Sequence, residues 1–118
     1  MVSGTVSSRP AGAIKEALFM DQHVMEIAEF RAEPGVDDHT LVAAAKGLDV
    51  WLRAQAGFVW RRLAKCEDGS WVDVLEWTSL QAAQAAANSI MSAPSAAPLM
   101  QLIAKGARMR HAYIHLAP

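Results

Sequence analysis

Three polar side chains occupy positions in the sequence where apolar residues are expected. Glu26, Asp73 and His111 each lie in the middle of a segment rich in Val, Ile, Leu, Met or Trp. A carboxylate buried in such a segment must be hydrogen-bonded, paired or protonated, because its isolated burial is costly. An acid and a histidine held together in a dry pocket can act as a general base. These three residues are therefore the candidate catalytic set.

Each of the three also has a purely structural interpretation. Glu26 or Asp73 could face a partner subunit and pair with an arginine such as Arg61 or Arg62, and perturbed acids are often structural. His111 could be a core histidine whose ring is satisfied by a backbone carbonyl. The sequence leaves both interpretations open.

Metal, phosphate and nucleophile chemistry is not indicated. His111 and His115 lie four residues apart, which on a strand separates them by about 13 Å, too far for one ion to bridge. The chain has no Gly-rich phosphate loop, no nucleophile elbow and no clustered Cys/His spacing. Its single cysteine, Cys66, fits a reducing compartment. We therefore expect no metal, no cofactor and a cytoplasmic location.

The candidate residues belong to a strand–helix–strand pattern that occurs twice. In chain order we predict a strand over 23–31, a helix from Asp37 or Asp38 to about Ala54, strands over 58–65 and 71–77, a helix from Thr78, a helical piece over 99–104 and a strand over 109–116. Thr78 and Gln81 match a capping box, which places the second helix start at Thr78. Asp68-Gly69 predicts a tight hairpin turn.

This order is that of a split βαβ, or ferredoxin-like, fold. We predict a flexible N-terminal arm over 1–21 and an α+β domain over 22–118, with a four-stranded antiparallel sheet and helices on one face. The predicted strands are apolar on both faces, whereas a half-exposed sheet should alternate apolar with polar residues. Monomers rarely expose so large an apolar area, so we expect a second copy to cover it in a homodimer.

Composition narrows the possible partners. The chain has 118 residues, of which 53% are hydrophobic and 19% charged, as in folded globular proteins. With a formal net charge of -1, it shows no basic face for a phosphate backbone. No apolar run approaches the roughly 20 residues that span a bilayer. We therefore expect neither a nucleic-acid nor a membrane partner.

Three stretches carry a resemblance to known proteins: HVMEIAEFRAEPG, AGFVWRRLAKCEDGSWVDVLEWTSLQAAQAAA and MRHAYIHLAP. The features that carry the resemblance are a Pro-Gly after the first strand, Gly57-Phe58 before the second, and Trp77 before a polar turn and an alanine-rich helix. Over residues 22–118 the chain resembles the dimeric α/β-barrel superfamily and, within it, the antibiotic-biosynthesis-monooxygenase-like group. The resemblance implies a dimeric α/β barrel, with a ligand pocket between sheet and helices in each subunit.

By position, the resemblance also implies which side chains face that pocket. They are Glu26, Ala28, Asp73, Leu75, Trp77, His111 and Tyr113. The candidate substrate contacts are Trp77, Tyr113, Ala28, Leu75 and Trp51, the last because an indole can stack on a flat aromatic ligand. In a simpler interpretation, the tryptophans and Tyr113 fill the core or the dimer interface. A one-residue slip in register would invert the assignment.

Three functions fit this pattern. The resemblance implies a cofactor-independent monooxygenase for a small aromatic or polyketide-like substrate, in which His111, supported by Asp73 or Glu26, takes a phenolic proton. One alternative is a protein that binds a small hydrophobic or aromatic ligand without turnover, and another is a polyketide cyclase or isomerase. Haem degradation is disfavoured, because haem-degrading relatives use a first-strand Asn and a His in the second helical region, which this chain lacks.

Overall fold

The structure is a computed structural model that describes residues 22–118; the predicted arm over residues 1–21 lies outside the described residues. In chain order the elements are β1 (Val24–Phe30), α3 (Asp38–Arg53), β2 (Phe58–Lys65), β3 (Trp71–Trp77), α4 (Leu80–Ile90), the 3-10 helix η1 (Pro94–Ala96), α5 (Ala97–Leu102) and β4 (Arg108–Tyr113). The predicted ferredoxin-like α+β fold is confirmed.

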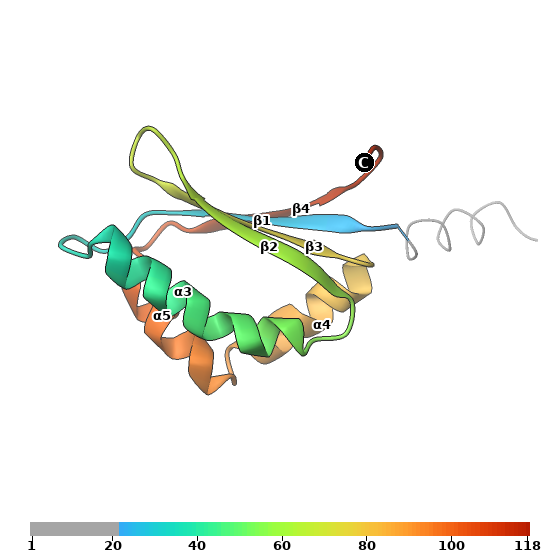
Figure 1. Cartoon of the computed structure of the whole chain (residues 1–118), viewed down its shortest axis with the longest axis horizontal. Coiled ribbons are helices and arrows are strands. Elements are labelled where there is room, and N and C mark those ends of the chain that lie inside the picture. The colour runs from blue at the N-terminus through green and yellow to red at the C-terminus, as the bar shows by residue number, and fades with distance from the viewer. Residues whose placement is uncertain (1–21) are drawn as a thin grey trace, which may run out of the picture.

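Within residues 22–118 the strands form one antiparallel sheet in the order β2-β3-β1-β4. Helices α3, α4 and α5 pack against one face, and no described helix covers the other (Figure 1). We call these the inner and outer faces. Because successive side chains of a strand alternate between faces, the register decides which residues meet the helices.

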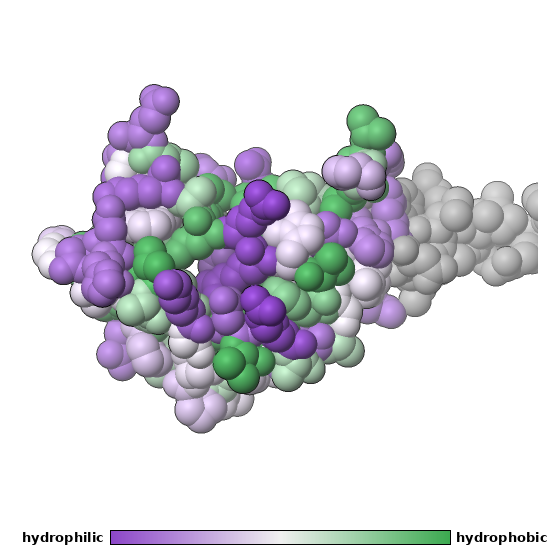
Figure 2. All heavy atoms as spheres, viewed as in Figure 1, coloured by the Kyte–Doolittle hydropathy of each residue, from purple (hydrophilic) through white to green (hydrophobic). Residues whose placement is uncertain are grey.

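The sheet and its helices enclose the hydrophobic core. Val24, Leu41 and Trp77 are its most deeply buried large side chains, contributed by β1, α3 and β3. The alanine-rich face of α4 buries Ala83 and Ala86, whose small side chains let the helix approach the sheet closely. The surface over α3 and β2 mixes hydrophilic with hydrophobic residues, as expected for a solvent-facing side (Figure 2).

The helix starts are set by side-chain caps, and one differs from the prediction. Asp37 caps α3 as expected, its carboxylate accepting a backbone N–H of the first turn at 2.7 Å. The prediction that Thr78 begins the second helix was wrong, because Ser79 is the cap and accepts the backbone N–H of Ala82 at 3.1 Å. Thr78 instead donates its backbone N–H to the carbonyl of Gly57 at 2.8 Å, which ties α4 to the start of β2.

Bounds near the C-terminus also differ from the prediction: α5 ends at Leu102 rather than Ala104, and β4 begins at Arg108 rather than Met109. The last short helix begins at Ala97 rather than Leu99, because Pro98 is accommodated in the first turn, where no backbone N–H is needed. Strand β4 ends at Tyr113 rather than Leu116. Beyond it, Ile114 still donates its backbone N–H to the carbonyl of His23 at 2.9 Å, but Leu116 is exposed.

Within residues 22–118, the outer face of the sheet is partly exposed to solvent. Its apolar side chains Met25, Ile27, Val72 and Val74 are partly exposed. Charged residues lie around them, among them Glu29, Arg62 and Arg110. In the described part of the chain, only the inner face is covered by helices (Figure 1). No described helix is both long enough and apolar enough to cross a membrane.

Candidate functional site

A cavity of about 290 Å³ lies between the inner face of the sheet and helices α3 and α5. Most of its lining is apolar and includes Phe30, Leu48, Leu52, Leu75, Leu99 and Ile103. The charged side chains in its wall include Glu26, Arg61 and Asp73. A mostly apolar cavity with a few converging polar groups is the usual form of a small-molecule site.

The register places every predicted strand residue of the site on the inner face. Glu26 pairs with Leu75 on β3 and with His111 on β4. Four predicted site residues line the cavity: Glu26, Ala28, Asp73 and Leu75. Four others lie outside its lining: His111, Trp77, Tyr113 and Trp51. The roles assigned to all eight stay predictions.

Glu26 and His111 form a close pair beside the cavity. Oε1 of Glu26 lies 3.5 Å from Nε2 of His111, longer than the roughly 2.8 Å of a strong charge-assisted hydrogen bond. Neither of these atoms has a hydrogen-bond partner among the described residues, and the same holds for Nε1 of Trp77. Three buried polar atoms therefore lie in one region, and of the three residues only Glu26 lines the cavity.

The environment of Glu26 favours its protonated form. Burial raises the pKa of Glu26 above its ordinary value of 4.5, and the negative charge of Asp73 acts in the same direction. The neighbouring His111 and the indole of Trp77 oppose this rise without cancelling it. A carboxyl whose pKa is raised by burial holds a proton more readily than a free carboxyl, which suits it to accept and return a proton during a reaction.

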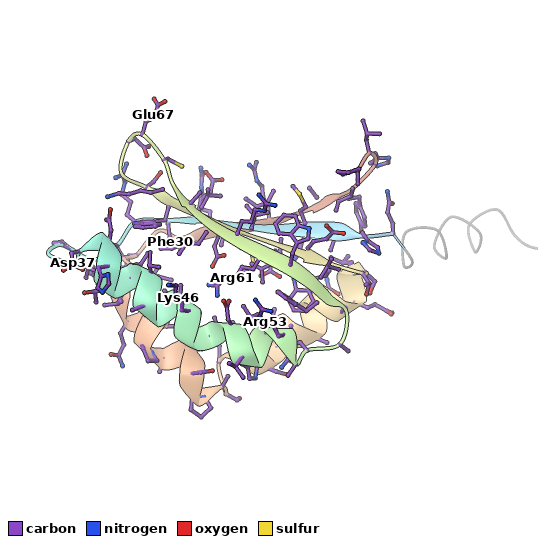
Figure 3. The ribbon with its side chains drawn as sticks, in the orientation of Figure 1. Phe30, Asp37, Lys46, Arg53, Arg61 and Glu67 are labelled. Atoms are coloured by element: carbon purple, nitrogen blue, oxygen red, sulfur yellow. The ribbon has the colours of Figure 1, made fainter. Side chains whose placement is uncertain are left out.

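Asp73 is held in a different way, by a bidentate ion pair with Arg61. Nε and Nη2 of Arg61 donate to the two carboxylate oxygens of Asp73 at 2.9 and 2.7 Å. Nη1 donates to the carbonyl of Ala45 at 2.8 Å and to Asp49 at 3.0 Å, both on α3. Figure 3 shows Arg61 projecting from β2 into the space between the sheet and α3. The ion pair therefore joins the sheet to the helix.

This network corrects part of the structural interpretation of the acids. Asp73 does pair with Arg61, but within the chain and on the inner face, not toward a partner subunit. Glu26 lies beside His111 rather than beside an arginine. Burial alone would lower the pKa of Arg61, but Asp73 and Asp49 raise it, so the guanidinium stays charged. The two inner acids thus have different electrostatic environments.

Arg61 was expected from the sequence only as a possible ion-pair partner of Glu26 or Asp73, not as a residue of the site. A register shift between Phe58 and Trp60 puts one extra residue into β2. Phe58 and Arg61 consequently both face the helices, although they are three residues apart. The signal in the sequence was the Arg61-Arg62 pair within a mostly apolar strand, but the bulge that turns Arg61 inward is not visible there.

The fold and the cavity define a ferredoxin-like α+β protein with a potential ligand site beneath the sheet. A scan of family models and a search of curated proteins found no match. Among solved structures, a point mutant of SnoaB, a cofactor-independent oxygenase from Streptomyces nogalater, matches with a TM-score of 0.67 and 18% identity, covering 81% of this chain and 96% of that chain.

Two further structures have the same architecture. A putative antibiotic biosynthesis monooxygenase from Bordetella bronchiseptica has a TM-score of 0.70 and 13% identity, covering 80% of this chain and 99% of that chain. A protein of unknown function from Nitrosomonas europaea has a TM-score of 0.63 and 14% identity, covering 84% and 95%. At these identities the likeness shows the fold. It confirms the ferredoxin-like fold that the predicted resemblance implies.

Proposed function

We propose that this protein is a cofactor-independent monooxygenase that acts on a small aromatic or polyketide-like substrate. One observation carries the proposal. Glu26, an acid whose pKa is raised by burial, lies in the wall of an apolar cavity with His111 behind it at 3.5 Å. The fold shared with the cofactor-independent oxygenase SnoaB supports this choice among the chemistries that a general base can serve.

In the proposed reaction Glu26 is the group that meets the substrate, because it lines the cavity and His111 does not. The ionised carboxylate of Glu26, next to His111, removes a proton from an electron-rich phenol or quinol-type ring. The resulting carbanion or enolate passes electrons to dioxygen, forming a carbon–oxygen bond and a hydroperoxide. The proton returns to the peroxide oxygen to give the hydroperoxide. The remaining hydrogen on that ring carbon then leaves as a proton while the O–O bond breaks; the departing hydroxide takes up this proton and leaves as water, and the carbon becomes a carbonyl.

The apolar side chains of the cavity wall would keep bulk water away from the reacting atoms. Substrate and dioxygen together supply all the atoms and electrons, because one oxygen atom enters the product and the other leaves as water. An anionic or radical intermediate must meanwhile be kept from bulk water. Leu48 and Leu52 of α3 and Leu99 of α5 cover the inner face beside Glu26 and would provide that exclusion.

Oxygen uptake tests the proposal. We expect the full chain to consume dioxygen with at least one member of a panel of dihydroxynaphthalenes and anthrones. Glu26→Gln should reduce the rate by about 100-fold, the usual contribution of a positioned base. His115→Gln is the matched control, because His115 lies beyond the end of β4. No uptake across the panel, or full activity in Glu26→Gln, would contradict the proposal.

Two further measurements separate the alternatives predicted from the sequence, a cyclase or isomerase and a binding protein without turnover. A cyclase or isomerase using the same base would form product under strict anaerobiosis. A binding protein would retain an aromatic ligand in native mass spectrometry and form no product in either atmosphere.

A cytoplasmic location stays a prediction.

We also propose that the protein is a homodimer in which a second copy covers the outer face. This proposal rests on Met25, Ile27, Val72 and Val74, which form a partly exposed apolar centre on a face that no described helix covers (Figure 1). Sedimentation equilibrium at micromolar concentration should give twice the mass of the chain. Val74→Glu should give a folded monomer, whereas a wild-type monomer would contradict the proposal.

A further inference from the structure

The hydrogen bonds of Arg61 bear on which ligands the cavity can hold. A guanidinium has five N–H bonds to donate. Four of those on Arg61 are used, two by Asp73, one by Ala45 and one by Asp49. The Arg61 side chain is only 7% exposed, so its geometry is set by these partners. A ligand entering the cavity therefore finds one N–H of Arg61 without an assigned acceptor.

The remaining charged groups of the cavity wall do not favour an anion. Glu26 and Asp73 are both acids. Arg108 also borders the cavity, but it is exposed and its Cα lies opposite that of Glu29, an outer-face residue, so its charge is solvated rather than buried in the cavity. An anionic group buried here would lose its hydration without gaining a free cation, and such burial is costly.

The cavity also limits the size of its ligand. Its volume of about 290 Å³ is at the lower end of pockets that hold drug-sized molecules, which run from about 300 to 1,000 Å³. The wall beside Asp73 is largely aliphatic, with Leu48, Leu52 and Leu75. One or two fused rings fit this space better than an extended tetracyclic system.

We propose that the Arg61–Asp73 pair makes the cavity selective for uncharged phenolic or quinol-type rings of one or two rings and excludes aromatic carboxylates of the same size. The inference rests on the proposed site and deepens it, because it assigns the charge state and size of the substrate. The pair acts by occupying the guanidinium that would otherwise bind a carboxylate.

Two probes with the same ring system test the selectivity of the wild-type chain. The dissociation constants of 2-naphthol and 2-naphthoate are measured by calorimetry at pH 7 without dioxygen. We expect 2-naphthol, uncharged at this pH, to bind at least about tenfold more tightly, because the naphthoate must bury an uncompensated charge. Equal affinities, tighter binding of 2-naphthoate, or no binding of either probe would overturn the proposal.

A matched pair of variants tests whether Asp73 is the cause. Asp73→Ala removes both acceptor oxygens from the cavity side of Arg61 and leaves room for a ligand carboxylate. We expect the affinity for 2-naphthoate, relative to 2-naphthol, to rise by at least about tenfold, because the guanidinium can then bind the ligand in a bidentate way. Asp73→Asn, which keeps one acceptor oxygen, should give a smaller rise.

Asp49→Ala is the control. It changes the net charge by the same amount and removes another partner of Arg61, but Asp49 is not part of the cavity lining. In Asp49→Ala the affinity for 2-naphthoate relative to 2-naphthol should equal that of the wild type. A rise in this ratio as large as in the Asp73 variants would overturn the proposal. If Asp73→Ala does not fold, as judged by circular dichroism, the Asp73→Asn, Asp49→Ala and wild-type ratios decide the question.

This test is independent of turnover. Selective binding of 2-naphthol without oxygen uptake on any substrate would reject the proposed monooxygenase and leave the selectivity standing. Equally efficient oxygen uptake with carboxylated and uncharged rings would support the proposed monooxygenase and reject the selectivity.

Discussion

Glu26 and His111 are direct cross-strand partners on β1 and β4, with Oε1 and Nε2 3.5 Å apart on the inner face of the sheet. They are 85 residues apart in the chain (111 − 26). Asp73, the other inner acid, is held by Arg61 instead. One carboxylate is thus tied into a structural ion pair, while the other retains capacity to exchange a proton.

The raised pKa of Glu26 predicts the pH dependence of stability. Because its pKa is higher in the folded chain than in the unfolded chain, the protonated form stabilises the fold. This contribution is complete below the ordinary value of 4.5 and is lost as the pH rises through the folded pKa. Urea unfolding of wild type and Glu26→Gln from pH 4 to 8 should show the variant gaining stability relative to wild type. A constant difference would contradict the raised pKa.

Removing His111 should raise the pKa of Glu26 further, because His111 is the largest of the influences that lower it. In His111→Phe we expect the acid limb of the pH–rate profile to move to higher pH, since Glu26 must be ionised to act as a base. A ¹³C-NMR titration of the Glu26 carboxyl reads the same shift without turnover. His115→Phe should leave it unchanged, and an unshifted titration in His111→Phe would argue against the pair.

Breaking the inner ion pair should be strongly destabilising. Arg61→Met leaves Asp73 buried without its bidentate partner, and losing one side of a buried pair costs about 3–5 kcal/mol in free energy of unfolding. Lys46→Met removes an exposed cation on α3 instead and should change stability by less than about 0.5 kcal/mol. Chemical denaturation measures both, and equal effects would show that Arg61 is not the link between sheet and helix.

Two glycines should respond in opposite ways to the same substitution. Gly57 has a φ of 84°, and a Cβ added there would lie 2.5 Å from the Cβ of Ala82, so Gly57→Ala should destabilise the fold by about 1–3 kcal/mol. Gly47 lies within α3 with no neighbour that an added Cβ would meet within 4 Å, so Gly47→Ala should stabilise it by about 0.5–1 kcal/mol. Thermal unfolding of both variants checks the signs.

Local patterns in the sequence were enough to predict the elements and their order. Alternating apolar residues marked the strands, Asp37 marked the start of α3, and Asp68-Gly69 marked the hairpin, where Gly69 has a φ of 87°. Each of these signals involves residues close together in the chain, so local chain physics determines them. Where two adjacent residues could both cap a helix, as at Thr78 and Ser79, the sequence could not choose between them.

The arrangement of the site was decided by tertiary structure. The sequence named Glu26, Asp73 and His111 but could not say which of them pair, because the pairing depends on strand register across long loops. The bulge before Trp60 turned Arg61 inward and assigned Asp73 to it. Residue types thus determined which chemistry was available, whereas strand register and one inserted residue decided which side chains meet, since those depend on packing between distant segments.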